Sequence, residues 1–174
     1  MVRPGDLRRV MSRMRREYIK SWAPRDYRTL QDVSAEIDGI EAADHEGTIQ
    51  ATGNWSPGQI MDHTARLLEG SLDGFDAQAP LPIRLLGRFV FKPKLGKSHM
   101  KPGIQLPKKA VSVLPAEVVA TPDGIARMRT VLKRIQGGER MTHDSPVLGK
   151  MSHEQWELFH CDHCRLHFGF LKLP

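Results

Sequence analysis

The stretch His160-Cys161-Asp162-His163-Cys164-Arg165-Leu166-His167 is the chemically densest part of this 174-residue chain. It holds three of the eight histidines and both of the cysteines. Ahead of it, Ser152 and Gln155 have the spacing of a capping box, and no helix-breaking residue follows before Gly169. The sequence therefore predicts that the stretch lies on a helix.

On a helix, the three histidines of this stretch share one face. At roughly 100° per residue, His160, His163 and His167 fall within about 60° of arc. His163 and His167 stand at i and i+4, the spacing that lets two imidazoles bind one cation. Two ligands do not complete a site, so a third is expected from another helix.

Apolar residues recur with helical spacing in three further segments, 26–44, 56–75 and 122–136. Ser56 and Pro57 are typical of a helix start, Thr121 is the expected cap of the segment after it, and Gly137 ends that helix. No convincing strand pattern is present. Four helices with one long connection favour an all-α fold, a four-helix bundle with a long, basic, proline-rich crossover loop.

His63 lies on the apolar stripe of segment 56–75 and is expected to face the core. A single histidine there is more often a hydrogen-bonded core residue than a ligand, but in a bundle it faces the His163 and His167 pair. Three neutral imidazoles suit zinc, nickel, iron or copper and leave a position open for water or substrate. Asp62 and Asp162 point about 100° away from their neighbouring histidines, so they are at most supporting or surface groups.

The two cysteines allow competing interpretations. Cys161 and Cys164 have the spacing of a redox pair or of half a zinc knuckle, although no second such pair is present. His160 and Cys164, also at i and i+4, are second-tier metal candidates. The favoured role of both thiols is small apolar filling. Few cysteines and no secretory pattern predict a reducing, cytoplasmic location, and no apolar run is long enough to span a membrane.

The connection from Ala77 to Thr121 has six prolines and eight lysines or arginines, with no acidic residue between Asp76 and Glu117. We expect a short helix at 81–91, with Leu85, Leu86, Phe89 and Val90 packed down. Its cations are equally consistent with solvated loop charge and with recognition of an anionic substrate. The candidate substrate-binding residues in this segment are Arg84, Arg88 and Lys92.

The net charge of +6 is concentrated at the N-terminus. Residues 1–28 carry nine Lys or Arg against three acidic residues, and the rest of the chain is balanced. We therefore divide the chain into a basic N-terminal extension, 1–24, and a bundle domain, 25–174. The extension is interpreted first as a solvated arm. Nucleic acid is not the favoured partner, because no nucleic-acid-reading motif accompanies the arm.

Several motifs, in order, resemble the DinB-like (YfiT-like) superfamily of metalloproteins, and more narrowly a bacterial branch of it that is a domain of unknown function. The resemblance covers roughly Tyr27 to Leu171. The residues that carry it are 53–63 (GNWSPGQIMDH), 71–75 (SLDGF), 102–107 (PGIQLP), 143–149 (HDSPVLG), and Trp156 leading to His160, His163 and His167.

This resemblance implies an up-down-down-up four-helix bundle and a divalent metal, commonly nickel or zinc, held by His63, His163 and His167. Characterised relatives include transferases and isomerases that use low-molecular-weight thiols, and metal-dependent hydrolases. The Arg-rich arm and the Cys161 and Cys164 pair depart from the usual pattern.

Two hypotheses follow. In the first, the chain is a metalloprotein, and the enzyme question stays open between a thiol-dependent transferase and a hydrolase acting on a small-molecule substrate, with a homodimer as a further expectation. In the second, it is a non-catalytic binding module whose basic arm docks nucleic acid or an anionic surface. Deleting residues 1–20 distinguishes them, because only the second predicts that salt-sensitive binding is then lost.

Overall fold

The computed structural model describes residues 21–103 and 114–174. The basic arm from Met1 to Lys20, and most of the motif at 102–107, lie outside the described residues. The described part is mostly helical, with one small sheet. In chain order the elements are α2 (Leu30–His45), β1 (Gln50–Ala51), α3 (Pro57–Asp73), α4 (Leu81–Leu86), η1 (Gly87–Phe91), η2 (Lys92–Lys94), α5 (Thr121–Gln136), α6 (His153–Phe168) and β2 (Leu171–Lys172).

Three of the long helices begin at a capping box, in which a side chain and a backbone N–H at the helix start bond reciprocally. The boxes pair Thr29 with Asp32, Ser56 with Gln59, and Ser152 with Gln155. The predicted starts of α3 and α6 are thus confirmed, whereas α2 begins at Leu30 instead of Asp26.

The predicted cap of α5 was wrong. Thr121 is already the first helical residue, so Ala120 occupies the capping position and no side chain bonds the first turn.

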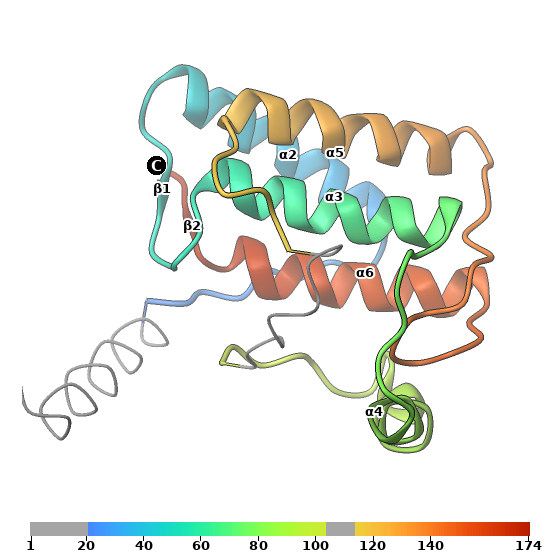
Figure 1. The fold of residues 1–174 in the computed structure, drawn as a ribbon. Helices are drawn as coiled ribbons and strands as arrows, with labels where there is room; N and C mark the ends of the chain where they lie inside the picture. The colour runs from blue at the N-terminus through green and yellow to red at the C-terminus, as the bar shows by residue number, and fades with distance from the viewer. Residues whose placement is uncertain (1–20, 104–113) are drawn as a thin grey trace, which may run out of the picture.

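The four long helices lie side by side, and each makes its main contacts with two others (Figure 1). α3 and α2 each pack against both α5 and α6. The apolar stripes meet in one buried cluster that includes Ile37, Leu68, Met128 and Trp156. Because α3 and α6 are neighbours, side chains on their facing stripes can share one site.

The two-stranded sheet was not predicted from the sequence. β1 pairs antiparallel with β2, with Gln50 opposite Lys172 and Ala51 opposite Leu171. Strands of two residues are too short to show a period of two. The pairing continues as Thr52 donates its backbone N–H to Phe170 at 2.9 Å, so the entry to α3 is fixed beside the end of α6.

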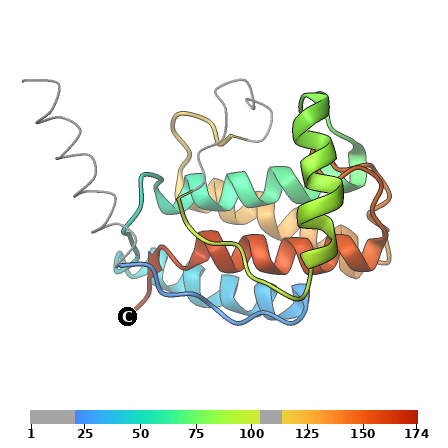
Figure 2. The ribbon, with the colours of Figure 1, turned by 90° about the horizontal axis from the view of Figure 1, so that it is seen from below.

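The segment 81–94, made of α4, η1 and η2, stands outside the four long helices and runs crosswise to them (Figure 2). The predicted helix at 81–91 forms, but the predicted packing was wrong, because Leu85, Leu86, Phe89 and Val90 are all exposed. The segment contacts the molecule through Gly87 instead, where an added Cβ would lie 2.3 Å from the Val147 carbonyl oxygen.

Within 21–103 and 114–174, no helix has the length and apolar character needed to cross a membrane.

Candidate metal centre

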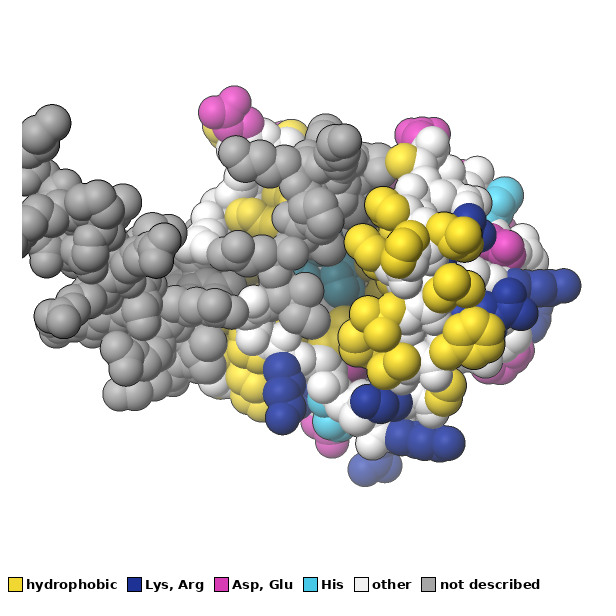
Figure 3. Space-filling view, turned by 60° about the horizontal axis from the view of Figure 1, so that its bottom comes forward, with side chains coloured by type: hydrophobic (Ala, Val, Ile, Leu, Met, Phe, Trp, Pro, Cys, Tyr) yellow, Lys and Arg dark blue, Asp and Glu magenta, His cyan; other side chains and the backbone are white. Residues whose placement is uncertain are grey.

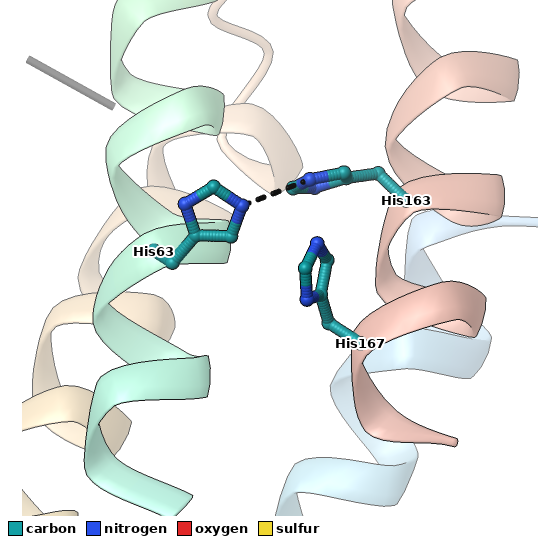
Figure 4. A group of neighbouring side chains, drawn as sticks. All are labelled: His63, His163 and His167. Carbon is teal, nitrogen blue, oxygen red and sulfur yellow. Dashed lines mark hydrogen bonds between the residues drawn. The ribbon is translucent and has the colours of Figure 1, made fainter. Parts of the chain in front are cut away.

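Three histidine side chains converge between two of the long helices. His63 comes from α3, and His163 and His167 come from adjacent turns of α6 (Figure 4). One ring nitrogen from each lies within 4.8 Å of the other two. The structure therefore brings together the three residues that the sequence nominated as metal ligands.

The spacing of the ring nitrogens fits a common ion. The Nε2 atoms of His63 and His163 are 3.1 Å apart. Two nitrogens bound tetrahedrally to one zinc ion at about 2.0 to 2.1 Å would be about 3.3 Å apart. The full set of three nitrogens lies within 4.8 Å, so the rings would close in around a shared ion.

Burial favours the neutral form of His163 and His167. His63 and His163 are buried, and His167 is half-buried. Burial, and then the neighbouring histidines, hold the pKa of His163 and of His167 well below the ordinary value. A neutral imidazole offers a lone pair, which a metal ion needs and a protonated ring cannot give.

The His163 ring has a neighbour at only one of its nitrogens. Its Nδ1 is buried and makes no hydrogen bond to any described residue, whereas Nε2 faces His63. The three rings turn toward one another, and one nitrogen of each can donate a lone pair to the same cation (Figure 4). The donor set therefore fits a divalent metal.

Two aromatic rings support the histidines. Trp55 stacks on His167, with ring centroids 5.3 Å apart and planes at 17°, and also lies 4.7 Å from the His63 ring. Phe159 stacks on His163 at 5.8 Å and 13°. Neither support was predicted from the sequence, although Phe159 is four residues before His163 and so one turn away on the same face. The stacking restricts the ring orientations of the cluster.

The second-tier metal candidates lie elsewhere. His160 is fully buried, stacks on Trp156, and its Nε2 is 3.2 Å from the Ser71 hydroxyl oxygen. Burial lowers its pKa to about 3. Cys164 belongs to the apolar core, where burial raises its thiol pKa well above the ordinary value. Neither residue is part of the histidine cluster.

The two aspartates next to the ligand candidates are engaged in other contacts. Asp62 accepts from Arg66 and Arg127, both at 2.7 Å; although burial raises its pKa, these hydrogen bonds hold it below the ordinary value. Asp162 accepts from His99 and from the Met100 backbone N–H. Both aspartates thus point away from the cluster, as their helical offset predicts.

The candidate substrate-binding residues belong to the crosswise segment 81–94. Arg84 is half-buried, Arg88 lies over the Phe89 ring at 5.8 Å, and Lys92 donates to the Lys150 carbonyl oxygen. Arg88 is exposed, so its charge faces solvent. Their role toward a substrate stays a prediction.

Comparison with known proteins gives a family. The model of the family described as "Protein of unknown function (DUF1569)" matches residues 23–173. No curated protein and no solved structure matches the chain. The match spans all the described long helices and the three clustered histidines.

Proposed function

The chain belongs to the DUF1569 family, and from this premise we propose that it is a divalent-metal-binding protein whose ligands are His63, His163 and His167. The observation that carries the proposal is the convergence of three imidazole nitrogens within 4.8 Å, at a site between two packed helices where His63 and His163 are buried. Zinc and nickel are the preferred ions, because imidazole ligands suit both.

We also propose that the fold is the up-down-down-up bundle of the DinB-like superfamily. The pairwise packing of α2, α3, α5 and α6, with the long connection between α3 and α5, supports this assignment. So does the origin of the ligands, two from the last long helix and one from the second. Bundle cores commonly build metal sites from facing helices in this way.

The proposed activity is transfer or hydrolysis at a small electrophilic substrate, with a low-molecular-weight thiol or water as nucleophile. A divalent ion lowers the pKa of a bound nucleophile so that it is ionised near neutral pH. The chain's own contribution is a rigid ligand set, supported by Trp55 and Phe159, and a half-buried His167 on the more open side. Three protein ligands leave a coordination position for the nucleophile.

The surroundings of the cluster bear on the choice of reaction. Asp62 is held by two arginines and Asp162 by His99 and a backbone N–H, so neither carboxylate is free to serve as a general base. A nucleophile that ionises on the metal needs no such base, whereas peptide cleavage of the His-Glu-x-x-His type relies on one. The site therefore favours thiol or water activation over proteolysis.

The experiment that tests metal binding is a titration of metal-free protein with cobalt(II), followed by its visible absorption bands. Wild type should bind one equivalent and give the intense bands of a four- or five-coordinate site. His63→Ala and His163→Ala should weaken binding at least about 100-fold, since each removes a ligand. His45→Ala is the matched control, because His45 is exposed at the end of α2. Equal affinity in all four proteins would refute the ligand assignment.

The activity is tested separately. Zinc- and nickel-loaded protein is mixed with a low-molecular-weight thiol and a chromogenic electrophile, or with an activated ester for the hydrolytic alternative. The turnover expected of wild type should disappear in His163→Ala and persist in His45→Ala. Metal binding without turnover of either substrate would leave a metal-binding protein and remove the proposed enzyme.

A further inference from the structure

The crosswise segment 81–94 presents the largest group of exposed apolar side chains in the described structure. Phe89 is 68% exposed and Leu81 is 64% exposed. We define the apolar patch as the seven exposed large side chains of α4 and η1, namely Leu81, Ile83, Leu85, Leu86, Phe89, Val90 and Phe91. They gather on one side of the molecule (Figure 3).

The patch faces outward because of how its helix is attached. Gly87 lies against the Val147 backbone, so the side of the helix that carries Gly87 faces the molecule. Leu81, Leu85 and Phe89 follow one another at intervals of four, on the side opposite Gly87. At both ends the segment is tethered to the loop before α6, by the Ala79 N–H bonded to the Pro146 carbonyl and by Lys92 bonded to the Lys150 carbonyl.

All the charged residues of the segment that carries the patch are positive. Between Asp76 and Glu117 the sequence contains no acidic residue. Figure 3 shows Lys and Arg side chains beside the patch, and Asp and Glu side chains elsewhere on the same face. The described cations of this stretch of sequence are Arg84, Arg88, Lys92, Lys94, Lys97 and Lys101. Most of them are exposed.

We propose that this face docks on an anionic lipid membrane, with the exposed apolar side chains of α4 and η1 inserted into the interface and the cations of the segment at the headgroups. An interfacial helix buries leucine, isoleucine and phenylalanine below the headgroups while lysine and arginine contact the lipid phosphates. The apolar patch and its cations supply both parts. Because the helix protrudes from the long helices as a ridge, it can insert into a soft surface without a matching groove.

A second copy of the chain is the main competing occupant of the patch. In a two-fold symmetric dimer the same patch would face itself, and the cations of both segments would be brought together. Like charges placed opposite one another across an interface are repulsive. The segment itself provides no carboxylate to compensate them, whereas anionic headgroups would do so.

The test is co-sedimentation with vesicles of neutral phosphatidylcholine, and with vesicles that also contain about 30% phosphatidylglycerol, at low and at physiological salt. Wild type should bind the anionic vesicles at least about tenfold more strongly than the neutral ones, and salt should weaken that binding. Failure to bind anionic vesicles at low salt would overturn the proposal.

Two variants distinguish binding through the apolar patch from non-specific adsorption to the vesicles. The pair Leu85→Asp and Phe89→Asp in one protein should reduce vesicle binding at least about tenfold, because it puts charge where the apolar face must insert. Val118→Asp is the matched control, since Val118 is 86% exposed and lies outside the segment; it should bind as wild type does. Equal loss in both proteins would contradict the assignment.

Two more measurements keep the result interpretable. Arg88→Gln with Lys94→Gln should weaken binding to anionic vesicles at least about threefold, although it removes no apolar contact. Sedimentation of each protein without lipid reports self-association. A wild-type dimer that becomes monomeric in the Leu85→Asp, Phe89→Asp protein, with no vesicle binding in either, would show that the patch joins copies of the chain and would overturn the proposal.

Discussion

At the scale of single residues, burial decides which side chains can react. The thiols of Cys161 and Cys164 are buried in the core beside the α6 histidines. Burial raises the pKa of Cys161 to about 12 and that of Cys164 well above its ordinary value. A thiol that stays protonated is a poor nucleophile and a poor metal ligand. This agrees with apolar filling, the role that the sequence favoured for both cysteines.

The first prediction concerns these thiols. At pH 8, native protein should incorporate almost no iodoacetamide during a period in which unfolded protein incorporates two equivalents, because both thiols are buried and protonated. Mass spectrometry of the intact protein counts the added groups. Rapid labelling of either cysteine in the native state would contradict the description, and would restore the alternative of a redox pair.

The second prediction concerns His160 and pH. Burial holds its pKa to about 3, below the ordinary 6.5, so the unfolded state binds a proton that the folded state does not. The stability from the neutral ring is complete above pH 6.5 and is lost as the pH falls toward 3. In metal-free protein, protonation of this one histidine lowers the free energy of unfolding by up to about 1.4 kcal/mol for each pH unit below 6.5. His160→Gln should abolish this contribution. Glutamine retains an N–H near the Ser71 hydroxyl.

Urea unfolding of both metal-free proteins at pH 7, 5 and 4 measures this effect. The wild-type free energy of unfolding should fall more steeply with decreasing pH than that of the variant. His163 and His167, whose pKa values are also lowered, should keep some pH dependence in both proteins. If the free energy of unfolding fell equally with pH in both proteins, His160 would not contribute to the pH dependence, which would contradict the prediction.

At the scale of secondary-structure elements, the tight contact between α3 and α5 holds the ligand-bearing helix in place. A Cβ added at Gly124 would lie 2.5 Å from the Gly58 carbonyl oxygen and 2.8 Å from the Met61 Cβ. Such distances require the two helices to move apart. Because His63 lies one turn and a half after Gly58 on α3, this close approach also helps to fix the position of His63.

The third prediction uses this contact. Gly124→Ala should destabilise the protein by about 1 to 3 kcal/mol through overpacking. The matched control is Gly39→Ala on α2, where the added methyl would meet only Leu173 at 4.0 Å. That change should stabilise the protein by about 0.5 to 1 kcal/mol, because alanine is the better helix former. Denaturant unfolding measures both, and destabilisation by Gly39→Ala of similar size would contradict the close-packing argument.

The starts of two helices and the core-facing stripes could be predicted from the sequence alone. The boxes at Ser56 and Ser152 set the starts of α3 and α6, because capping is local and its signature lies within four residues. Amphipathic spacing set the core stripes for the same reason. The strands Gln50–Ala51 and Leu171–Lys172 could not be predicted, because their pairing depends on two segments more than a hundred residues apart.

The exposure of α4 and η1 shows a second limit. Seven large apolar side chains among eleven residues cover most of the helix circumference, so the pattern did not indicate which side packs on the molecule. Because the segment contacts the molecule at Gly87, the large apolar side chains of the helix remain exposed to solvent. Local sequence predicts that a helix forms, but not how far it stands from its neighbours.

At the scale of the whole molecule, the ring of contacts among α2, α5, α3 and α6 makes the histidine cluster possible. His63, His163 and His167 could be nominated from the sequence because the apolar face of each helix restricts which side chains can meet between packed helices. The stacking of Trp55 on His167 was not foreseen, because it depends on the β1 and β2 pairing that fixes the entry to α3 beside the end of α6.

Binding at a site formed by two helices should also stabilise the whole fold. An ion held by α3 and α6 together binds the folded state only, so it raises the free energy of unfolding by mass action. The fourth prediction is that zinc or nickel at about 100 times the dissociation constant adds about 2.7 kcal/mol to the wild type. Thermal unfolding with and without metal measures this, and His63→Ala should show almost no gain.

The most direct test of the account is the metal content of untagged protein purified without added metal, measured by elemental mass spectrometry. Wild type should carry about one divalent ion per chain after purification or reconstitution, as a site with three protein ligands requires. His63→Ala and His163→Ala should lose it, whereas His160→Ala should retain it, because His160 bonds to Ser71 outside the cluster. A wild type that neither retains nor takes up a divalent ion would contradict the metal centre.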